Sequence, residues 1–450
     1  MPNLCIRWLA ALALVAAPSI LQGQPDGASP DLDKLREATG GRTGLAVHVG
    51  TSDGKLESAL AQGGRMLVHG LALDTKAVAA ARQTIATANV DGLATVQQVN
   101  DVSRLPYADG LVNVLIVDLD ALGDGAPAET DRMRVLAPRG VAFVRSDGTW
   151  KTSVKPSRSD VDEWPQYWYN ATGNPISRDK AVAPPTGVRW IGGIHSEATT
   201  PQNGHRIRDG LLAYESTPDK DRSVMVCRDA YNGIVQWAVV REHRDAYRAF
   251  KGKPLLNIDG RIFTVIEEEN APLVEIDAKT GDVIRRFEEG GRTAKSQGRG
   301  RFDPGTVTNV VHHDGKLIQT AGNTVYVLKL DGSLVWKKTL EGQEALDFPT
   351  VDPEGGRVFV ASAPMERWKR GARNPQVEAD AIFALDLKAG RELWKSPLKE
   401  KLVTQIIYDK GGVYLYEAMP IGHDEFSMKR LDAATGECLW TYEGSKQEIG

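Results

Sequence analysis

The first half of the chain alternates short apolar runs with amphipathic segments. The apolar runs predict strands at 45–49, 66–71, 94–99, 112–118 and 140–145, and the amphipathic segments predict helices near 54–62, 74–88 and 127–136. Strands separated in this way by helices are typical of a parallel sheet covered on both faces. We therefore predict an α/β domain whose ligand crevice lies at the carboxyl ends of the strands.

After Val188 the pattern changes to paired short strands. A strand, a turn with Asp or Asn, a glycine and a second strand recur, as in "DAKTGDV" and "DAATGECLW". The turn glycines are Gly233, Gly281, Gly332, Gly390 and Gly436, at spacings of 48, 51, 58 and 46 residues. Periods near 50 residues with hairpin signals predict an all-β propeller of four-stranded blades over residues 188–450.

A tryptophan follows the turn glycine by four residues in four of the five copies, and the second copy has Arg285 there. These tryptophans are Trp237, Trp336, Trp394 and Trp440. A four-stranded blade cannot bury both of its faces alone, so we predict that the tryptophans are structural and fill the space between neighbouring blades.

Residues 149–187 separate the two patterns and show neither periodicity. The segment is rich in Pro, Asp and Asn and carries Trp164, Tyr167, Trp168 and Tyr169. Aromatic side chains gain much from burial. We therefore predict an aromatic, Pro-rich linker that packs against a neighbour instead of a flexible tether.

The first residues have the pattern of a targeting segment. One positive charge at Arg7 precedes an apolar run from Trp8 to Ala17 and then small residues. This pattern predicts a signal peptide over residues 1–23 and an exported protein, periplasmic, in the cell envelope or secreted, with an uncleaved anchor as the alternative. No other stretch is apolar enough to predict a membrane span.

Charge and cysteine content narrow the range of partners. The net charge of −4 gives no electrostatic attraction to nucleic acid. Beyond the predicted signal peptide only Cys227 and Cys438 remain, which allow at most one disulfide and no cysteine metal cluster. We therefore expect an unknown protein or envelope component as partner, and no metal.

Four segments of the first half resemble a known family. In order and spacing, "VHVGTSDGKL", "VHGLALDTKAVAAAR", "VNDVSRLPYADGLVNVLIVD" and "RMRVLAPRGVAFV" are similar to the landmarks of class I S-adenosylmethionine-dependent methyltransferases. The resemblance implies a Rossmann-like fold over residues 32–148.

The same resemblance implies where a cofactor would bind. It places Gly50, Ser52 and Gly54 in the turn that approaches the methionine part of S-adenosylmethionine, and Asp101 at the adenine amino group. Asp101 is alternatively a turn residue after a strand. Ser52 replaces the middle glycine of the family's turn, and a side chain there would obstruct close backbone approach if the position needs a positive φ.

Other landmark positions also depart from the family. His48 replaces an acidic residue, and Ala72 stands where the family has the acid that binds the ribose hydroxyls. Asp74 follows two residues later and is alternatively a helix cap. Asp118 and Asp120 end the fourth predicted strand, where family members keep catalytic or substrate residues, and solvated loop carboxylates are the alternative.

Two further points count against methyl transfer. The family's sheet closes with a hairpin after its fifth strand, but "RSDGTWKTSVKPSRSD" is short and polar, so we predict a missing or remodelled substrate wall. An exported domain would also meet little S-adenosylmethionine, and no site fills without ligand. We expect a degenerate domain in which S-adenosylmethionine remains an open possibility.

The repeat of the second half is similar to quinoprotein-type propellers, found in pyrroloquinoline quinone (PQQ) dehydrogenases and in an outer-membrane assembly lipoprotein. These propellers generally have seven or eight blades. Five copies ending at Trp440 imply either a five-bladed ring or a truncated array, which we favour and which would expose an edge strand.

A quinone site would need calcium held by oxygen ligands and a catalytic carboxylate. Residues 267–270, "EEEN", offer such oxygens, but an exposed acidic turn is the simpler interpretation, and the adjacent Cys-Cys pair of many relatives is absent. The histidines and acid that fall near the predicted tunnel have no diagnostic metal spacing. They are His195, Glu197, His205, His312 and His313.

Three functions therefore compete. The first is an exported, non-catalytic binding or scaffold protein, whose domain order and "RDAYNG" motif resemble a family of large exported propeller proteins. The second is an S-adenosylmethionine-dependent methyltransferase, favoured by Asp101 and "RVLAPRG". The third is a PQQ-dependent dehydrogenase, which the acidic run permits and nothing requires. We predict the first, without a bound cofactor.

Overall fold

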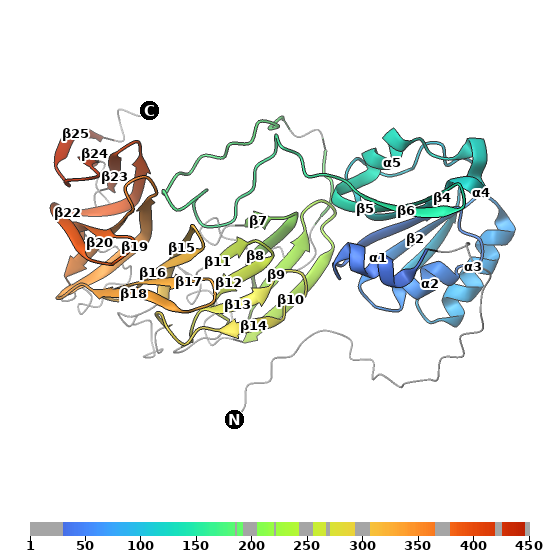
Figure 1. Cartoon of the computed structure of the whole chain (residues 1–450), viewed down its shortest axis with the longest axis horizontal. Helices are drawn as coiled ribbons and strands as arrows, with labels where there is room; N and C mark the ends of the chain where they lie inside the picture. Colours follow the sequence, from blue (N-terminus) through green and yellow to red (C-terminus); the bar gives the residue numbers. More distant parts are fainter. Residues whose placement is uncertain are drawn as a thin grey trace, which may run out of the picture.

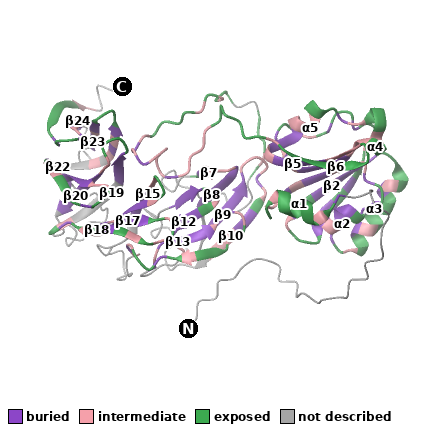
Figure 2. Cartoon of the chain, viewed as in Figure 1, coloured by how far each residue is buried: buried purple, intermediate pink, exposed green. Residues whose placement is uncertain are grey.

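The computed structural model describes residues 30–184, 187–191, 205–219, 222–242, 255–266, 271–292, 307–364, 379–418 and 425–445. An α/β domain and an array of antiparallel sheets lie side by side (Figure 1). Buried residues concentrate along the strands of both bodies (Figure 2). The predicted signal peptide, residues 1–23, lies outside the described residues.

The N-terminal domain is built on a six-stranded sheet of order β3-β2-β1-β4-β5-β6. Its strands are β1 (Gly44–Val49), β2 (Met66–Ala72), β3 (Ala94–Gln98), β4 (Val112–Asp118), β5 (Leu136–Ser146) and β6 (Thr149–Val154). The first five run parallel, and β6 runs antiparallel to β5. This order confirms the predicted Rossmann-like α/β fold.

Helices cover both faces of this sheet. They are α1 (Leu32–Thr39), α2 (Lys55–Ala61), α3 (Thr75–Thr87), α4 (Leu119–Leu122) and α5 (Glu129–Val135), with a short 3₁₀ turn η1 (Gly123–Gly125) after α4. Leu35, Leu60 and Ile85 of the first three helices pack on one face, and Val135 of α5 packs on the other. Both faces of the strands are therefore apolar, as the continuous runs predicted.

The predicted absence of a hairpin after the fifth strand is wrong. The segment forms β6, which pairs with β5 along its whole length. Asp147 and Gly148 both have positive φ, 52° and 71°, as a two-residue hairpin turn requires. Asp120 holds this turn by accepting hydrogen bonds from both backbone N–H groups, at 3.0 and 2.8 Å. Because β6 is an edge strand with an exposed face, its polar sequence is compatible with pairing.

In the described ranges the second body contains three four-stranded sheets and one seven-stranded sheet, which correspond to one four-stranded blade for each of the five repeat copies. The first three are β7 (Arg206–Arg208), β8 (Leu211–Asp219), β9 (Arg222–Asp229) and β10 (Val235–Glu242); β11 (Leu255–Ile258), β12 (Arg261–Thr264), β13 (Val274–Asp277) and β14 (Val283–Arg286); and β15 (Val307–His313), β16 (Lys316–Ala321), β17 (Thr324–Lys329) and β18 (Leu334–Thr339).

The last two blades share one strand. Their seven-stranded sheet comprises β19 (Gln343–Asp352), β20 (Arg357–Pro364), β21 (Ala379–Asp386), β22 (Glu392–Asp409), β23 (Gly412–Ala418), β24 (Glu425–Asp432) and β25 (Cys438–Ser445). The first part of β22 pairs with β21 as the outer strand of the fourth blade, and its second part pairs with β23 as the inner strand of the fifth. One continuous strand thus joins the two blades.

Neighbouring blades are locked together by an aromatic ring and a glycine, which we call a socket. The indole Nε1 of Trp237 donates to the carbonyl of Ala278 at 2.9 Å, and the ring lies against Gly281 in the turn of the second blade. A Cβ on Gly281 would lie 2.7 Å from the Trp237 ring. The glycine is therefore required by both its φ of 77° and the close approach of the ring.

The same socket recurs along the array. Trp336 donates to Leu387 at 2.8 Å and packs on Gly390, and Trp394 donates to Ala433 at 3.1 Å and packs on Gly436. Two sockets use aromatics that the sequence pattern missed. Phe287 packs on Gly332, and Trp190, which precedes the first blade, packs on Gly233 and donates to Ala230 at 3.2 Å.

Trp440 differs from the other repeat tryptophans. It is 40% exposed, whereas Trp237 and Trp336 are each 8% exposed, and its ring contacts Tyr414 of its own blade. Among the described residues it therefore fills no space between blades, contrary to the structural role predicted for all four tryptophans.

Residues 164–173, which we call the axial strap, cross the inner strands of all five blades. The strap contacts β7 through the backbone pair Trp164–Ile207, β11 through Pro165–Asn257, β15 through Gln166–His312, β19 through Ala171–Val351 and β22 through Thr172–Tyr408. These hydrogen bonds range from 2.7 to 2.9 Å. The aromatic linker therefore packs against its neighbours, as predicted.

Candidate functional site

The turn between β1 and α2 contains two glycines of positive φ, and its backbone bonds to the neighbouring strand of its own sheet. Gly50 and Gly54 have φ of 92° and 75°. The backbone N–H groups of Gly50 and Thr51 both donate to the carbonyl of Leu71 in β2, each at 2.9 Å. These two N–H groups are therefore directed at the protein and not at the crevice.

The other two predicted members of the turn also have structural explanations. A Cβ on Gly54 would lie 2.6 Å from the carbonyl oxygen of Ala81, so this glycine permits the close approach of α2 and α3. Ser52 is exposed and is not among the residues of positive φ. The serine therefore fits the turn without strain, and its side chain stands on the surface.

A buried carboxylate supports the turn from below. Glu57 of α2 is 1% exposed and accepts hydrogen bonds from His48 Nδ1 at 2.6 Å and from the Thr51 hydroxyl at 2.5 Å. Gly70 of β2 leaves the room for this cluster, because a Cβ there would collide with Thr51. His48, which stands where the family has an acidic residue, is thus hydrogen-bonded to the carboxylate of Glu57.

The charge state of this cluster follows from its contacts. Burial acts to raise the pKa of Glu57, but the hydrogen bonds from His48 and Thr51, together with the charge of His48, outweigh burial and hold the pKa below its usual value. The carboxylate is therefore ionised and engaged at neutral pH. Sequence reasoning missed Glu57 because nothing in its spacing points to His48.

Each predicted binding acid accepts a hydrogen bond from a nearby backbone N–H group. Asp74 accepts from Ala77 N at 2.8 Å as the N-cap of α3. Asp101 accepts from Ser103 N and from its hydroxyl, both at 2.7 Å. The Ser103 backbone bond, then its hydroxyl, lower the pKa of Asp101. These contacts are those of the structural alternatives, a helix cap and a turn residue.

Asp118, the acid at the end of the fourth strand, also has partners within the domain. Asp118 accepts from Ala121 N at 3.1 Å as the N-cap of α4, and it forms an ion pair with Arg145 at 2.9 Å. It does not pair with Asp120, which holds the β5–β6 turn. Ala72, at the position of the ribose-binding acid, is fully buried, and Leu73 follows it as an exposed apolar residue.

A histidine and a tyrosine close the loop after β3 over the sheet. His69 Nδ1 and the Tyr107 hydroxyl are 2.8 Å apart, and the rings meet edge to face. Burial lowers the pKa of His69 and raises that of Tyr107, so both groups are neutral at pH 7. The spacing of the two residues gave no signal for this pair.

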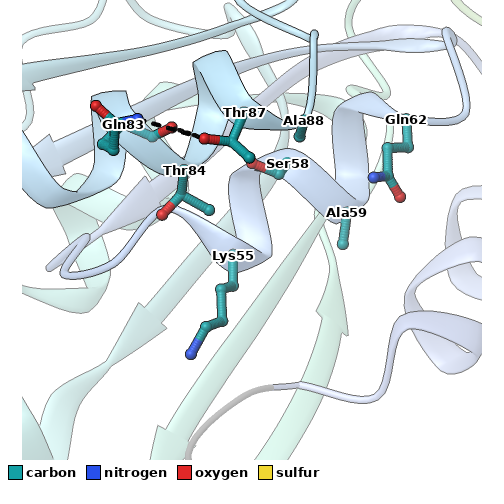
Figure 3. A pocket seen from close by; sticks show the side chains of 8 residues that line it. All are labelled: Lys55, Ser58, Ala59, Gln62, Gln83, Thr84, Thr87 and Ala88. Atoms are coloured by element: carbon teal, nitrogen blue, oxygen red, sulfur yellow. Dashed lines mark hydrogen bonds between the residues drawn. The ribbon is translucent and has the colours of Figure 1, made fainter. Parts of the chain in front are cut away.

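An open groove lies between α2 and α3, with a volume of about 410 Å³ (Figure 3). Lys55, Gln83, Thr84 and Thr87 give it a polar lining, and Gln83 donates to the Thr87 hydroxyl at 3.4 Å. The groove is formed by helix surfaces, so it does not bring the predicted binding residues together.

The structure describes only some of the residues that the sequence places near the propeller tunnel. Residues 267–270, His195 and Glu197 lie outside that part. The His205 ring packs on Tyr214, and the backbone of His312 bonds to the Gln166 side chain at 2.8 and 3.4 Å. Within the described ranges, no three His, Cys, Asp or Glu residues are grouped so as to hold a metal ion.

The structure describes both remaining cysteines and allows a search for membrane-spanning helices. Cys227 is buried and Cys438 is exposed, and both are free thiols. No helix in the described part of the chain has the length and apolarity needed to span a bilayer.

Comparison with protein families supports the propeller over its C-terminal part. Residues 321–450 match the family model of the outer membrane protein assembly factor BamB. No curated protein sequence matches the chain. The match contains both members of the last two sockets, Trp336–Gly390 and Trp394–Gly436.

Solved structures resemble each body separately. Quinohemoprotein alcohol dehydrogenase from Comamonas testosteroni is 16% identical over 64% of this chain and 49% of its own, with a TM-score of 0.42. BamB from Moraxella catarrhalis is 12% identical over 54% of this chain and 73% of its own, with a TM-score of 0.29. A SAM-dependent methyltransferase from Aquifex aeolicus is 17% identical over 25% of this chain and 62% of its own, with a TM-score of 0.23.

These similarities cover only part of the length of the known proteins. The chain spans about half the length of the alcohol dehydrogenase and under two thirds of that of the methyltransferase. The sheet order and the repeated sockets, more than these scores, define the architecture: a Rossmann-like α/β domain followed by the antiparallel blades of a β-propeller.

Proposed function

We propose that this protein is an exported, non-catalytic binding or scaffold protein with a degenerate methyltransferase-like domain. One observation carries the proposal. Two N–H groups of the Gly50–Gly54 turn and the acids Asp74, Asp101 and Asp118 all hold partners within the N-terminal domain. A ligand would have to displace the bonds of the two N–H groups and compete with the present donors for the three acids.

The crevice offers an adenosyl ligand little in exchange for the bonds that the ligand would break. Each displaced intramolecular hydrogen bond contributes about 0.5–1.5 kcal/mol, and those to charged groups about 1.5–3 kcal/mol. The side chain that would recover most of this loss from a ribose is absent, because buried Ala72 replaces a carboxylate. The crevice is therefore poorly suited to an adenosyl compound, and we propose that no cofactor is bound there.

Two observations support the export and the partner. The first residues have the pattern of a signal peptide, and residues 321–450 match a family described as an outer membrane protein assembly factor. We therefore propose a protein or another envelope component as the partner, with the propeller as the docking surface.

A methyltransferase is the second candidate, because Asp101 and "RVLAPRG" match landmarks of that family on a Rossmann-like sheet. Titration of the purified protein with S-adenosylmethionine up to millimolar concentration separates the two functions. We expect an unchanged melting temperature. A rise of several degrees that is lost in Asp101→Ala would show that the crevice binds S-adenosylmethionine and would favour the methyltransferase instead.

The quinone is tested separately. Reconstitution with PQQ and calcium should leave no bound chromophore after gel filtration. An absorbing complex that reduces a dye in the presence of an alcohol would contradict the non-catalytic assignment of the propeller.

A further inference from the structure

The turn of the first blade differs from the other four at two positions. The residue before the turn glycine is Asn232 in the first blade, and the residue three after the glycine is Gln236. The corresponding residues of the later blades are Thr280 and Ile284, Asp331 and Val335, Ala389 and Leu393, and Thr435 and Leu439. The four aliphatic residues are 37–49% exposed, whereas Gln236 is 8% exposed.

Gln236 is buried because it pairs with the backbone of the N-terminal domain. Its Nε2 donates to the carbonyl of Thr43 at 2.9 Å, and its Oε1 accepts from the Thr43 N–H at 2.9 Å. The amide side chain thus makes the two bonds that a neighbouring strand would make to the residue just before β1. An aliphatic side chain at this position makes neither bond.

Asn232 reaches the same edge of the sheet at β4. Its Nδ2 donates to Asn113 Oδ1 at 2.6 Å and to the carbonyl of Leu111 at 3.1 Å. Asn113 Oδ1 also accepts from the Leu45 N–H at 2.8 Å, and Asn113 Nδ2 donates to Asp229 at 2.8 Å. A single asparagine therefore joins β1, β4 and the turn of the first blade.

Two arginines extend the contact around this network. Arg42 donates to the carbonyl of Asp209 at 2.7 Å, and Arg139 forms an ion pair with the Asp209 carboxylate. Burial lowers the pKa of Arg42, although Asp229 and Asp209 act in the opposite direction. The contact between the domains is thus polar and specific. The turns of the other blades lack the side chains that make these hydrogen bonds.

We propose that Asn232 and Gln236 are a recognition pair by which the first blade docks the amino edge of the Rossmann sheet and holds the two domains as one rigid unit. Thr43, Leu45 and Asn113 lie at the amino ends of β1 and β4, so the carboxyl edge points away from the first blade. The recognition pair does not depend on whether the crevice binds a ligand.

Exchanging the turn chemistry between two blades tests the proposal. The variant Asn232→Thr/Gln236→Leu gives the first blade the residues of the fifth. We expect backbone hydrogen exchange at Thr43 to accelerate about tenfold or more, as loss of a bond worth about 1.4 kcal/mol implies. Exchange at Leu45 should accelerate less, because its acceptor Asn113 remains but loses the contact with Asn232. We also expect a larger radius of gyration in small-angle X-ray scattering.

The matched control is Thr435→Asn/Leu439→Gln, which places the same pair on the fifth blade and should change neither measurement. If the double variant fails to fold, Gln236→Leu alone should accelerate exchange at Thr43 and leave Leu45 protected. Unchanged protection of Thr43 and an unchanged radius of gyration in folded protein would overturn the proposal.

Discussion

The Rossmann domain and the propeller both contain glycine turns of positive φ, but they use them differently. In the Rossmann domain Gly54 makes room for α3, and the N–H groups of the turn close on Leu71. In the propeller each turn glycine makes room for an aromatic ring from the unit before it, as Gly390 does for Trp336. A glycine motif by itself therefore indicates close approach, and the neighbouring atoms decide whether a ligand or the protein approaches.

The largest loss of stability is expected when an aromatic ring is removed from its socket in the propeller. Trp336→Ala removes a buried indole and its bond to Leu387, and we expect a loss of about 3–5 kcal/mol in the free energy of unfolding. Chemical denaturation measures this loss. Trp440→Ala is the control, because a 40% exposed ring should cost less than about 1 kcal/mol. Equal losses would show that the sockets do not carry the stability of the array.

Filling a socket from the other side should cost somewhat less. Gly281→Ala adds a Cβ 2.7 Å from the Trp237 ring at a φ of 77°, and we expect a loss of about 2–4 kcal/mol from overlap and backbone strain. Gly260 has nearly the same φ of 79° and nothing within 4 Å of an added Cβ. Gly260→Ala should therefore cost only the strain, about 1–2 kcal/mol, and a smaller loss for Gly281→Ala would contradict the socket.

The turn of the Rossmann domain is tested through its buried carboxylate. Glu57→Gln should cost about 1–3 kcal/mol at pH 7, because His48 and Thr51 lose a charged acceptor. The folded pKa of Glu57 lies below its unfolded value of 4.5, so its stabilisation is present above about pH 4.5 and is lost as the pH falls through the folded pKa.

Urea denaturation between pH 3 and pH 7, a range set around the ordinary carboxyl pKa of about 4.3, measures this dependence. The variant should show a flatter decline of stability toward low pH than the wild type. Glu37→Gln, at an exposed position, should leave the decline unchanged. A variant as pH-dependent as the wild type would show that the ionised state of Glu57 does not support the turn.

The smallest effect is expected at the predicted adenine-binding acid. Asp101→Asn retains the shape of an exposed turn residue and should cost less than about 1 kcal/mol. Its melting temperature should respond to S-adenosylmethionine no more than that of the wild type. If S-adenosylmethionine raised the melting temperature of the wild type but not that of the variant, Asp101 would be a binding residue and not only a turn residue.

The five parallel strands of the Rossmann sheet were predictable to within a few residues, except for the start of β5, because a strand buried on both faces must be apolar throughout. The five blades were predictable because the glycine and tryptophan recur at a fixed offset. Phe287 was missed because it lies six residues after Gly281 instead of four. The β6 hairpin was missed because an edge strand needs no apolar run, although Asp147-Gly148 is a strong turn signal.

The site was less predictable than the fold. Asp74 and Asp101 were assigned both a binding and a structural reading, and only the geometry shows the caps. The contact between Glu57 and His48 depends on the crossing of a helix over a strand, and no periodicity encodes it. The same holds for Gln236, whose partner lies 193 residues earlier in the chain.

The axial strap sets the order in which the propeller assembles. The strap is synthesised before every blade, yet Gln405 of the last inner strand donates to Gly173 across a separation of 232 residues. Contacts this distant in sequence slow folding, and the strap has no complete set of partners until β22 has emerged from the ribosome. The earliest segment of the propeller to be made therefore cannot complete its hydrogen bonds until the inner strand of the fifth blade has been synthesised.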